Sequence, residues 1–499
     1  MSENIAVTVN GSVKNATRGM TISEIIEGER PCGGHGKCGK CKVIARGELS
    51  PLSAEEKRML TEEEIALGAR LACLTRAMGN CEVITEKATA RIEALEQSDI
   101  SGIPLSPTFE KYGIAIDIGT TTLAAALLNP KGRLVATATA LNPQARWGAD
   151  VISRIEAALG GASRDLALAI KEALNCLILE LTGNGGISPL EVERAVITGN
   201  TVMLSLLTEE SVEPFSHAPF IAERLFGERL TAEELSLTSL LADTEVYLPS
   251  AISAFVGADT TCAILATELY RLEWGMLIDI GTNGEMALVN NGRITVCSTA
   301  AGPAFEGVGI SMGMRGGSGA IDRVYIENGE IKAHVIGKSE PKGICGSGLV
   351  DLVAAMLDIG VIEEDGYLEE DEFTVLPPVS VTPRDIRMLQ LAKSAICAGI
   401  LTLIDSESLK TEDISRLYIA GGFGKYLGKE SAARIGLLPK ELAERALAVG
   451  NAALLGAVML LLNKDYGKTE KEITGGSRVL DLSVSPTFSE LYMSGMVFA

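Results

Sequence analysis

A short segment occurs twice in this chain, and its repetition constrains the fold more than any other feature. The first copy is Asp117-Ile118-Gly119-Thr120, and the second, far downstream, is Asp279-Ile280-Gly281-Thr282. Each copy lies between two apolar runs, which predicts a strand, a glycine turn and a returning strand. Glycine lets the backbone approach a phosphate, N–H groups and threonine hydroxyls donate to its oxygens, and aspartate can hold a hydrated Mg²⁺. Two copies predict two related lobes with a nucleotide between them; two unrelated hairpins with ordinary Asp-x-Gly turns are the alternative.

Length and charge limit the class of protein. A chain of 499 residues exceeds what one hydrophobic core serves, so we expect about three domains. The net charge of −21 disfavours nucleic acid or an anionic membrane as the main partner. The start, Met1-Ser2-Glu3-Asn4, has no signal-peptide pattern, and the apolar runs are too short to cross a bilayer. We therefore expect a cytoplasmic protein that does not use a membrane.

Four of the ten cysteines are spaced as metal ligands. Cys32, Cys38 and Cys41 lie in one glycine-rich loop, and Cys73 follows later. This C-x5-C-x2-C…C pattern is similar to the plant-type ferredoxin arrangement, C-x4-C-x2-C…C, in which four thiolates hold a [2Fe–2S] cluster. The glycines fit, because such a loop needs unusual φ values and free N–H groups that donate to the cluster sulfurs. The predicted order of hairpin, helix, cysteine loop and strands also resembles the β-grasp ferredoxin fold.

Other interpretations of the cysteines are open. A structural zinc site usually pairs two C-x2–4-C knuckles, whereas here the fourth cysteine stands alone. Cys81 could replace Cys73, and His35 could suggest a Rieske-type ligand, although four cysteines leave it no position to fill. The remaining cysteines have no ligand spacing and are expected in the core: Cys176, Cys262, Cys297, Cys345 and Cys397.

The rest of the chain alternates strands and helices, which predicts an α/β fold. We divide the chain into a ferredoxin-like domain (1–90), a linker (91–110), a first ATPase lobe (111–205) and a second lobe with the C-terminal region (206–499). No Walker A sequence (G-x4-G-K-[ST]) occurs, so the chain is not a P-loop ATPase.

From residue 112 to about 463 the chain resembles the actin/sugar kinase/Hsp70 ATPase superfamily. Asp117–Thr122 matches its first phosphate motif, Asp279–Glu285 its second, Thr198-Gly199-Asn200 a connecting motif, and Ala420-Gly421-Gly422-Phe423-Gly424 its adenosine motif. The resemblance implies a two-lobed ATPase that binds ATP and Mg²⁺.

Roles follow for individual residues as hypotheses. The metal ligands are Cys32, Cys38, Cys41 and Cys73 for the cluster, with Asp117 and Asp279 as candidates for Mg²⁺. Glu285 is the first candidate to orient the attacking water and Asp259 the second, although Glu285 could equally be a solvated hairpin residue. The nucleotide-binding set is Gly119, Thr120, Thr121, Thr122, Gly281, Thr282, Asn283 and Gly284 on the phosphate side, and Gly346, Ser347, Gly421, Gly422 and Phe423 on the nucleoside side.

A ferredoxin-type domain fused to this ATPase resembles the reductive activators of corrinoid proteins along the full length, including the closing 480–486 segment. The resemblance implies that one electron passes from the cluster to inactive Co(II) of a corrinoid protein, with ATP hydrolysis driving the transfer and an external low-potential donor refilling the cluster. Plant-type clusters have potentials of about −400 mV, and Co(I) is expected to demand a lower one. Each deficit of about 59 mV costs about 1.4 kcal/mol for one electron, so a nucleotide-driven step is needed.

Three alternatives stay open. They are a phosphotransferase of the acetate or sugar kinase type with a regulatory cluster, an activator of another low-potential enzyme, as in the dehydratase activators, and a nucleotide-gated binding module without turnover. The corrinoid should belong to a partner, because His35, His217 and His334 do not occur in the D-x-H-x-x-G pattern of B12 carriers. The sequence does not fix the oligomeric state, and a homodimer stays open.

Overall fold

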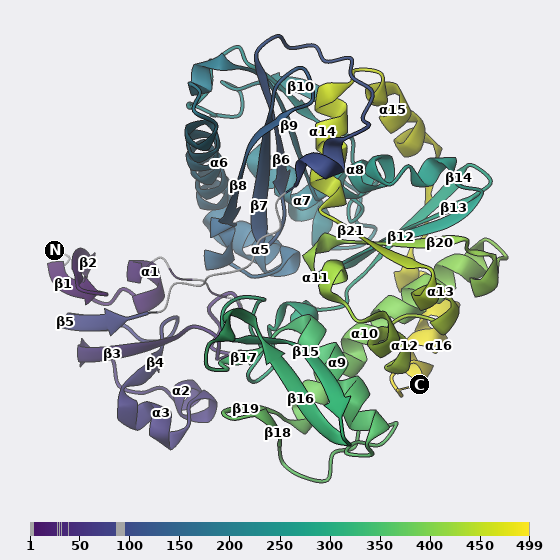
Figure 1. The fold of residues 1–499 in the computed structure, drawn as a ribbon. Helices are drawn as coiled ribbons and strands as arrows, with labels where there is room; N and C mark the ends of the chain where they lie inside the picture. Colours follow the sequence, from purple (N-terminus) through teal and green to yellow (C-terminus); the bar gives the residue numbers. More distant parts are fainter. Residues whose placement is uncertain are drawn as a thin grey trace.

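The computed structural model describes residues 4–26, 28, 30, 32–37, 39–85 and 95–498. Cys38 and part of the expected linker therefore lie outside the described residues. Figure 1 shows a small N-terminal sheet body, at the left, beside two larger lobes that each contain a six-stranded sheet.

The N-terminal body is one mixed sheet with strand order β2-β1-β5-β3-β4. Its elements are β1 (Asn4–Val9), β2 (Ser12–Thr17), α1 (Ile22–Ile26), β3 (Lys42–Leu49), α2 (Ala54–Met59), α3 (Glu62–Leu67), β4 (Ala69–Leu71) and β5 (Ala77–Ile84). The predicted hairpin turn is confirmed, since Asn10 and Gly11 both have positive φ, as a tight turn between two antiparallel strands requires. Capping boxes start α2 at Ser53 and α3 at Thr61, as their sequence spacing predicts.

The first lobe has a sheet with strand order β10-β11-β9-β6-β7-β8. The strands are β6 (Tyr112–Ile118), β7 (Thr122–Leu128), β8 (Leu134–Leu141), β9 (Val192–Gly199), β10 (Glu228–Thr231) and β11 (Glu245–Leu248), and the helices around them include α4 (Gln97–Ile100), α5 (Val151–Ala157), α6 (Ser163–Gly185) and α7 (Thr201–Leu207). Because β10 and β11 complete this sheet, the lobe boundary expected at residue 205 falls inside it and is wrong. β10 and β11 are only four residues long each, which is too short for a clear alternating pattern in the sequence.

The second lobe repeats the pattern, with strand order β21-β20-β12-β13-β14-β22. Its strands are β12 (Trp274–Ile280), β13 (Gly284–Asn290), β14 (Arg293–Thr299), β20 (Arg416–Ala420), β21 (Ala446–Gly450) and β22 (Ser477–Val479). In the first lobe β9 runs parallel beside β6, and β7 and β8 follow antiparallel; β20, β12, β13 and β14 have the same relations. The predicted duplication is therefore confirmed at the level of sheet topology.

Two helices lie between the sheets. They are α8 (Ala258–Ala266) and α14 (Ala452–Leu462), and Figure 1 shows α14, from late in the chain, standing beside β6 and β9. One side of the pair packs on apolar residues of the first sheet, such as Ala126 and Val196, and the other on the second sheet, such as Leu277 and Val289. This shared apolar layer is where the lobes join.

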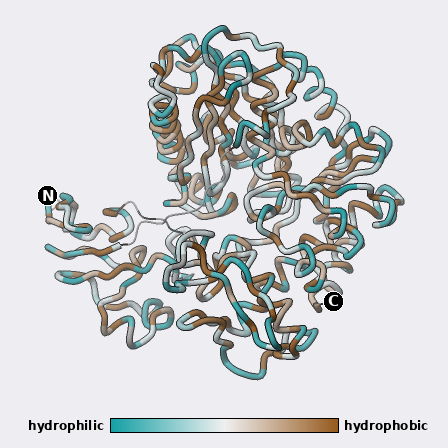
Figure 2. Tube along the Cα trace, viewed as in Figure 1, coloured by the Kyte–Doolittle hydropathy of each residue, from teal (hydrophilic) through white to brown (hydrophobic). Residues whose placement is uncertain are grey.

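The remaining elements cover the second lobe. They are β15 (Ala320–Glu327), β16 (Glu330–Val335), β17 (Gly343–Ile344), α9 (Gly346–Asp358), β18 (Phe373–Leu376), β19 (Val379–Val381), α10 (Pro383–Ser406), α11 (Gly421–Tyr426), α12 (Lys429–Arg434), α13 (Lys440–Glu444), α15 (Tyr466–Gly476) and α16 (Pro486–Ser494). By length and composition α10 could cross a membrane, but it packs as a core helix, with its apolar side chains buried in the second lobe. Figure 2 shows hydrophobic segments gathered in the strands, with hydrophilic segments in the outer loops.

Candidate nucleotide cleft and cysteine loop

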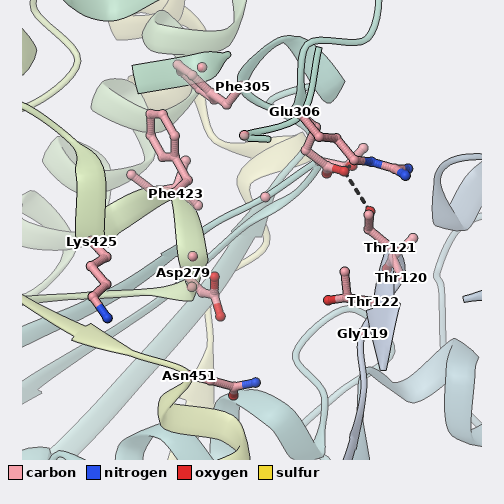
Figure 3. Close-up of a pocket in the computed structure, with 18 of the residues that line it drawn as sticks. Gly119, Thr120, Thr121, Thr122, Asp279, Phe305, Glu306, Phe423, Lys425 and Asn451 are labelled. Atoms are coloured by element: carbon pink, nitrogen blue, oxygen red, sulfur yellow. Dashed lines mark hydrogen bonds between the residues drawn. The ribbon is translucent and has the colours of Figure 1, made fainter. Parts of the chain in front are cut away.

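A cavity of about 550 Å³ lies between the lobes, and both predicted glycine turns line it. Figure 3 shows the turn carrying Thr120, Thr121 and Thr122 on one side and Asp279 on the other. A cavity of this size suits a small-molecule ligand, and its walls come from two lobes that share a helical layer. The structure thus brings the two repeated segments together across one cleft.

The first turn is fixed by contacts within its own lobe. Gly119 donates its N–H to the Thr122 carbonyl over 2.9 Å, closing the turn between β6 and β7. The buried Arg154 side chain donates a hydrogen bond to the Thr120 carbonyl. The Asn200 side chain, at the start of α7, donates to the Thr120 hydroxyl over 3.2 Å. The predicted connecting motif therefore reaches the cleft through Asn200, while Thr198 is fully buried in β9.

The second turn is also closed by a glycine N–H, but across one residue fewer than the first turn. Gly281 donates its N–H to the Asn283 carbonyl over 2.9 Å, between β12 and β13. Thr282, Asn283 and Glu285 line the cavity. Gly284 does not line it: a Cβ there would lie 2.3 Å from Ile396, so this glycine packs against α10.

Four predicted carboxyl groups gather at the base of the cleft. Burial, with repulsion from Asp259, raises the pKa of Asp117 to about 7, although a hydrogen bond from Asn451 opposes the shift. Burial and the same repulsion raise the pKa of Asp279 to about 7, and burial raises that of Asp259 to about 6. Burial raises the pKa of Glu285 well above its usual range, with Asp259 and Asp279 adding to it. Carboxyl groups crowded in this way favour either a proton or a divalent cation.

These carboxyl groups do not make a complete metal site on their own. Within the described ranges, no three His, Cys, Asp or Glu side chains converge closely enough to hold a metal ion by themselves. Mg²⁺ typically uses one or two carboxylates, several waters and the phosphates of a nucleotide. Asp117 and Asp279, from equivalent strands β6 and β12, suit that mode.

Glu306 is a cleft residue that the sequence analysis did not assign. Its carboxylate accepts a hydrogen bond from Thr121 over 2.6 Å (Figure 3) and another from Thr282, so it touches both glycine turns. It lies in a short 3-10 helix, η6 (Pro303–Glu306), that follows β14. Gly346 makes room for this helix, since a Cβ there would lie 2.1 Å from the Phe305 carbonyl oxygen. The sequence signal that could have identified Glu306 is an acidic residue inside a glycine- and proline-rich segment that follows a strand.

Asn451 is a second residue that was missed. It caps α14 by accepting the N–H of Leu454 over 2.8 Å, and its amide donates to Asp117 over 3.0 Å. A helix that joins the lobes therefore begins at a side chain bonded to a candidate Mg²⁺ ligand. No local pattern links Asn451 to Asp117, because the two residues are 334 positions apart in the sequence.

Part of the cleft wall consists of aromatic rings and glycines. Phe423 lies against Phe305, with ring centroids 4.8 Å apart, and both line the cavity (Figure 3). Gly421 has a φ of 81°, and a Cβ there would lie 2.6 Å from the Asp279 carboxylate. Only glycine therefore lets the end of β20 approach Asp279. The predicted nucleoside-side residues all line the cavity: Gly346, Ser347, Gly421, Gly422 and Phe423.

The structure also brings predicted cluster ligands together. The sulfurs of Cys41 and Cys73 lie 3.2 Å apart. A hydrogen bond from Cys41 lowers the pKa of Cys73, and one from the Gly36 N–H adds to it, against burial and the nearby charge of Cys32. A main-chain N–H aimed at a thiolate is what a cysteine-held cluster requires. Cys41 and Cys73 are thus in contact, and Cys32 is near enough for its charge to act on Cys73; Cys38 lies outside the described residues.

The cysteine loop has the backbone that its glycines predict. Gly33, Gly34, Gly36 and Gly39 have φ values of 65°, 87°, 66° and 64°. At Gly36 a Cβ would lie 2.6 Å from Leu74, directly after Cys73, so the loop closes tightly over that cysteine. Side chains other than glycine rarely adopt such φ values, and the loop therefore depends on this composition.

A buried carboxylate fixes the backbone around Cys73. Glu56 accepts hydrogen bonds from Arg70, Thr75 and the Leu71 N–H. Burial acts to raise the pKa of Glu56, but these bonds, with one from the Ser53 N–H, outweigh it and lower the pKa to about 2. Glu56, from α2, thus fixes the residues on both sides of Cys73 in the sequence.

Comparison with known proteins follows the same division of the chain. Residues 112–272 match the family described as the RACo middle region, and residues 273–499 match the C-terminal domain of RACo, the ASKHA domain. The corrinoid activation enzyme RamQ of Eubacterium limosum is 34% identical over an alignment of 431 residues that covers 79% of this chain and 72% of that protein. The [Co(II) methylated amine-specific corrinoid protein] reductase of Methanosarcina barkeri is 30% identical over an alignment of 419 residues that covers 77% of this chain and 76% of that protein.

A solved structure gives the same result. The reductive activator for a corrinoid, iron-sulfur protein superposes with a TM-score of 0.72 and 28% identity, over 99% of this chain and 98% of that one. The relatives and the two matching regions agree with the site geometry, and the chain belongs to the RACo family of corrinoid activation proteins.

Proposed function

We propose that this protein is the ATP-dependent reductive activator of a corrinoid protein, returning inactive Co(II) to Co(I). The observation that carries the proposal is the pairing of a thiolate loop with a two-lobed cleft in one chain: Cys41 lies beside Cys73, and Thr121 and Thr282 lie beside one carboxylate. The family membership adds that relatives with these two regions are named for corrinoid activation and for reduction of a Co(II) protein.

The first ninety residues would form a ferredoxin-type domain and residues 91–110 the linker. The strand order β2-β1-β5-β3-β4, with β1 parallel to β5, supports a β-grasp sheet. A [2Fe–2S] cluster held by Cys32, Cys38, Cys41 and Cys73 would supply a one-electron donor. The chain's own contribution is the positive-φ glycine loop, the Gly36 N–H directed at Cys73, and the Glu56 brace behind it. Reduced thiolate ligands also support a cytoplasmic location.

The cleft would bind ATP with Mg²⁺. Asp117 and Asp279 would orient the cation, the hydroxyls of Thr121 and Thr282 would contact phosphates, and Phe423 would lie on the nucleoside side. Glu285 and Asp259 remain the candidates to orient water. A cation here would relieve the repulsion among the buried carboxylates, so metal, phosphates and both lobes favour one closed arrangement. Closure changes the free energy of a partner complex if the two arrangements bind the partner unequally.

The proposal is tested by an anaerobic mixture of reduced protein, ATP, Mg²⁺ and a Co(II)-corrinoid protein, with the Co(I) absorption band as the readout. Asp279→Asn should stop ATP-dependent reduction, and Cys41→Ser should stop it by removing a cluster ligand. Cys176→Ser, at an exposed position of α6, is the matched control and should behave as wild type. Co(I) that forms equally fast without nucleotide would refute the coupling. ATP turnover that needs a small-molecule phosphate acceptor instead would indicate a kinase.

A further inference from the structure

The cysteine loop touches both lobes of the ATPase. On the first lobe, Arg30 donates its N–H to the Ala145 carbonyl over 2.9 Å. On the second lobe, Lys40 donates to the carbonyls of Ile310, Ser311 (3.3 Å) and Gly313 (2.9 Å). Arg30 and Lys40, at the two ends of the cysteine loop, therefore contact different lobes, and Lys40 directly precedes Cys41.

The two contact points are equivalent places in the duplicated fold. Ala145 lies in the 3-10 helix η1 (Pro143–Arg146), which follows β8, the third strand of the first lobe. The second contact follows η6, which comes after β14, the third strand of the second lobe. Just before η1, Asn142 donates its N–H to the Thr121 carbonyl over 2.9 Å; just before η6, Gly302 donates to the Thr282 carbonyl over 2.8 Å. Each of the two contacts thus rests on the segment bonded to one phosphate turn.

The second-lobe contact is rigidly connected to the cleft. Glu306, at the end of η6, binds both phosphate-turn threonines, and the backbones of Gly307 and Gly313 nearly touch, since a Cβ at Gly313 would lie 2.3 Å from the Gly307 carbonyl oxygen. Ser311 is also anchored, because its N–H donates to Asp385 over 2.7 Å. The carbonyls that hold Lys40 therefore move with the second lobe as one body.

A phosphate and Glu306 compete for the same donors. Each threonine hydroxyl donates one hydrogen bond, so a phosphate that takes those of Thr121 and Thr282 must release the Glu306 carboxylate. That release removes a link between the lobes at the level of η6. A change in the relative position of the lobes must then alter the two contacts, one with Ala145 and one with Gly313, and the Lys40 ammonium is the charged group at the second.

We propose that Lys40 is the positioning residue through which the nucleotide state of the cleft sets the placement of the cysteine loop. The proposal rests on the proposed function for the fate of the electron, but the linkage between cleft and loop stands independently of it. In this scheme the Lys40 contact belongs to the arrangement in which Glu306 holds both threonines, so nucleotide binding and the Lys40 contact disfavour each other. Because coupling between two sites is reciprocal, removing the contact must then tighten nucleotide binding, typically by roughly 5- to 150-fold for coupled sites.

The test uses the anaerobic, cluster-loaded full chain in four forms: wild type, Lys40→Met, Lys40→Arg and Lys42→Met. Lys42 is the matched control, since it lies two residues away and pairs with Glu64 inside the N-terminal body over 2.6 Å. Hydrogen exchange of the 32–41 and 307–316 segments is measured with and without MgADP, and the MgADP affinity by calorimetry. The visible spectrum reports whether the cysteine site is intact.

In wild type, MgADP should change exchange in the 32–41 segment, although no described residue of this segment lines the cleft. Lys40→Met should lose that change and bind MgADP tighter by the factor above, whereas Lys40→Arg, which still donates to carbonyls, and Lys42→Met should resemble wild type. The proposal is overturned if Lys40→Met equals wild type in both readouts, or if MgADP leaves the wild-type segment unchanged. Should Lys40→Met disturb the spectrum, Lys40→Gln carries the same test.

The two proposals fail separately. If wild type shows the MgADP effect on the loop but no Co(II) reduction with any corrinoid protein, the proposed function is wrong and the Lys40 linkage stands. If reduction depends on ATP and Lys40→Met reduces Co(II) with the same nucleotide dependence as wild type, the linkage is wrong and the proposed function stands.

Discussion

The Glu306 carboxylate accepts a hydrogen bond from the Thr121 hydroxyl over 2.6 Å, although the two residues belong to different lobes. Its second oxygen accepts from Thr282, in the phosphate turn of its own lobe. One side chain thereby joins the two repeated turns at the place where we propose that phosphates bind. The charge and position of Glu306 make it a competitor of the nucleotide.

Glu306→Gln should therefore bind ADP more tightly than wild type. The amide carries no charge that repels a phosphate, and a single carbonyl oxygen is a poorer acceptor for two hydroxyls. We expect a gain of about tenfold, which corresponds to about 1.4 kcal/mol, measured by calorimetry. Glu327→Gln, at an exposed position of β15, is the control. Weaker binding by Glu306→Gln would show that this carboxylate supports the nucleotide instead of competing with it.

Asp279→Asn should distinguish the contribution of Mg²⁺ to ATP affinity from that of the nucleotide alone. An amide cannot balance the charge of Mg²⁺ as a carboxylate does, so the gain in ATP affinity that Mg²⁺ provides should fall by roughly 10- to 100-fold. Affinity measured in EDTA should stay close to wild type. Asp322→Asn is a control from the wall of the same cavity, where Asp322 pairs with His334. An equal loss with and without Mg²⁺ would place Asp279 on the nucleotide itself.

Glu56 should give the N-terminal body an acid-sensitive stability. Its pKa of about 2 lies below the ordinary 4.5, so the folded state binds fewer protons than the unfolded state between these values. The stabilisation is full above pH 4.5 and is lost as the pH falls from 4.5 towards 2; its size is about 3 kcal/mol. Glu56→Gln should lose most of it at pH 7 and show a flatter profile, measured as exchange of the 69–84 amides. Glu82→Gln, exposed on β5, should leave the profile unchanged.

Two glycine substitutions should change the free energy of unfolding in opposite directions. At Gly456 in α14, a Cβ would lie 2.1 Å from the Cys262 carbonyl oxygen of α8, so Gly456→Ala should separate the helices that join the lobes. We expect the free energy of unfolding to fall by roughly 1–3 kcal/mol. At Gly467 in α15 a Cβ meets nothing within 4 Å, and Gly467→Ala should gain about 0.5–1 kcal/mol. Chemical denaturation measures both; a neutral Gly456→Ala would mean that the helix pair can relax.

Much of this protein could be predicted from local sequence. The two Asp-Ile-Gly-Thr turns, the capping boxes at Ser53 and Thr61 and the positive-φ glycines of the cysteine loop depend on a few adjacent residues. Turn and capping chemistry is short-range, because a hydroxyl, a carboxylate or a missing Cβ acts on neighbouring backbone groups. The sequence therefore determined which residue types stand at each glycine corner and which cysteines share a loop.

Which of these corners meet depends instead on contacts between segments that are far apart in the sequence. Glu306 and Asn451 reach Thr121 and Asp117 across large sequence separations, and the contacts of Arg30 with Ala145 and of Lys40 with Gly313 join the N-terminal body to both lobes. The boundary expected at residue 205 was wrong for the same reason, since β10 and β11 join their sheet by pairing with distant strands. Such contacts follow from how whole sheets pack on the shared helices α8 and α14. No local pattern encodes a distance that packing between distant segments sets.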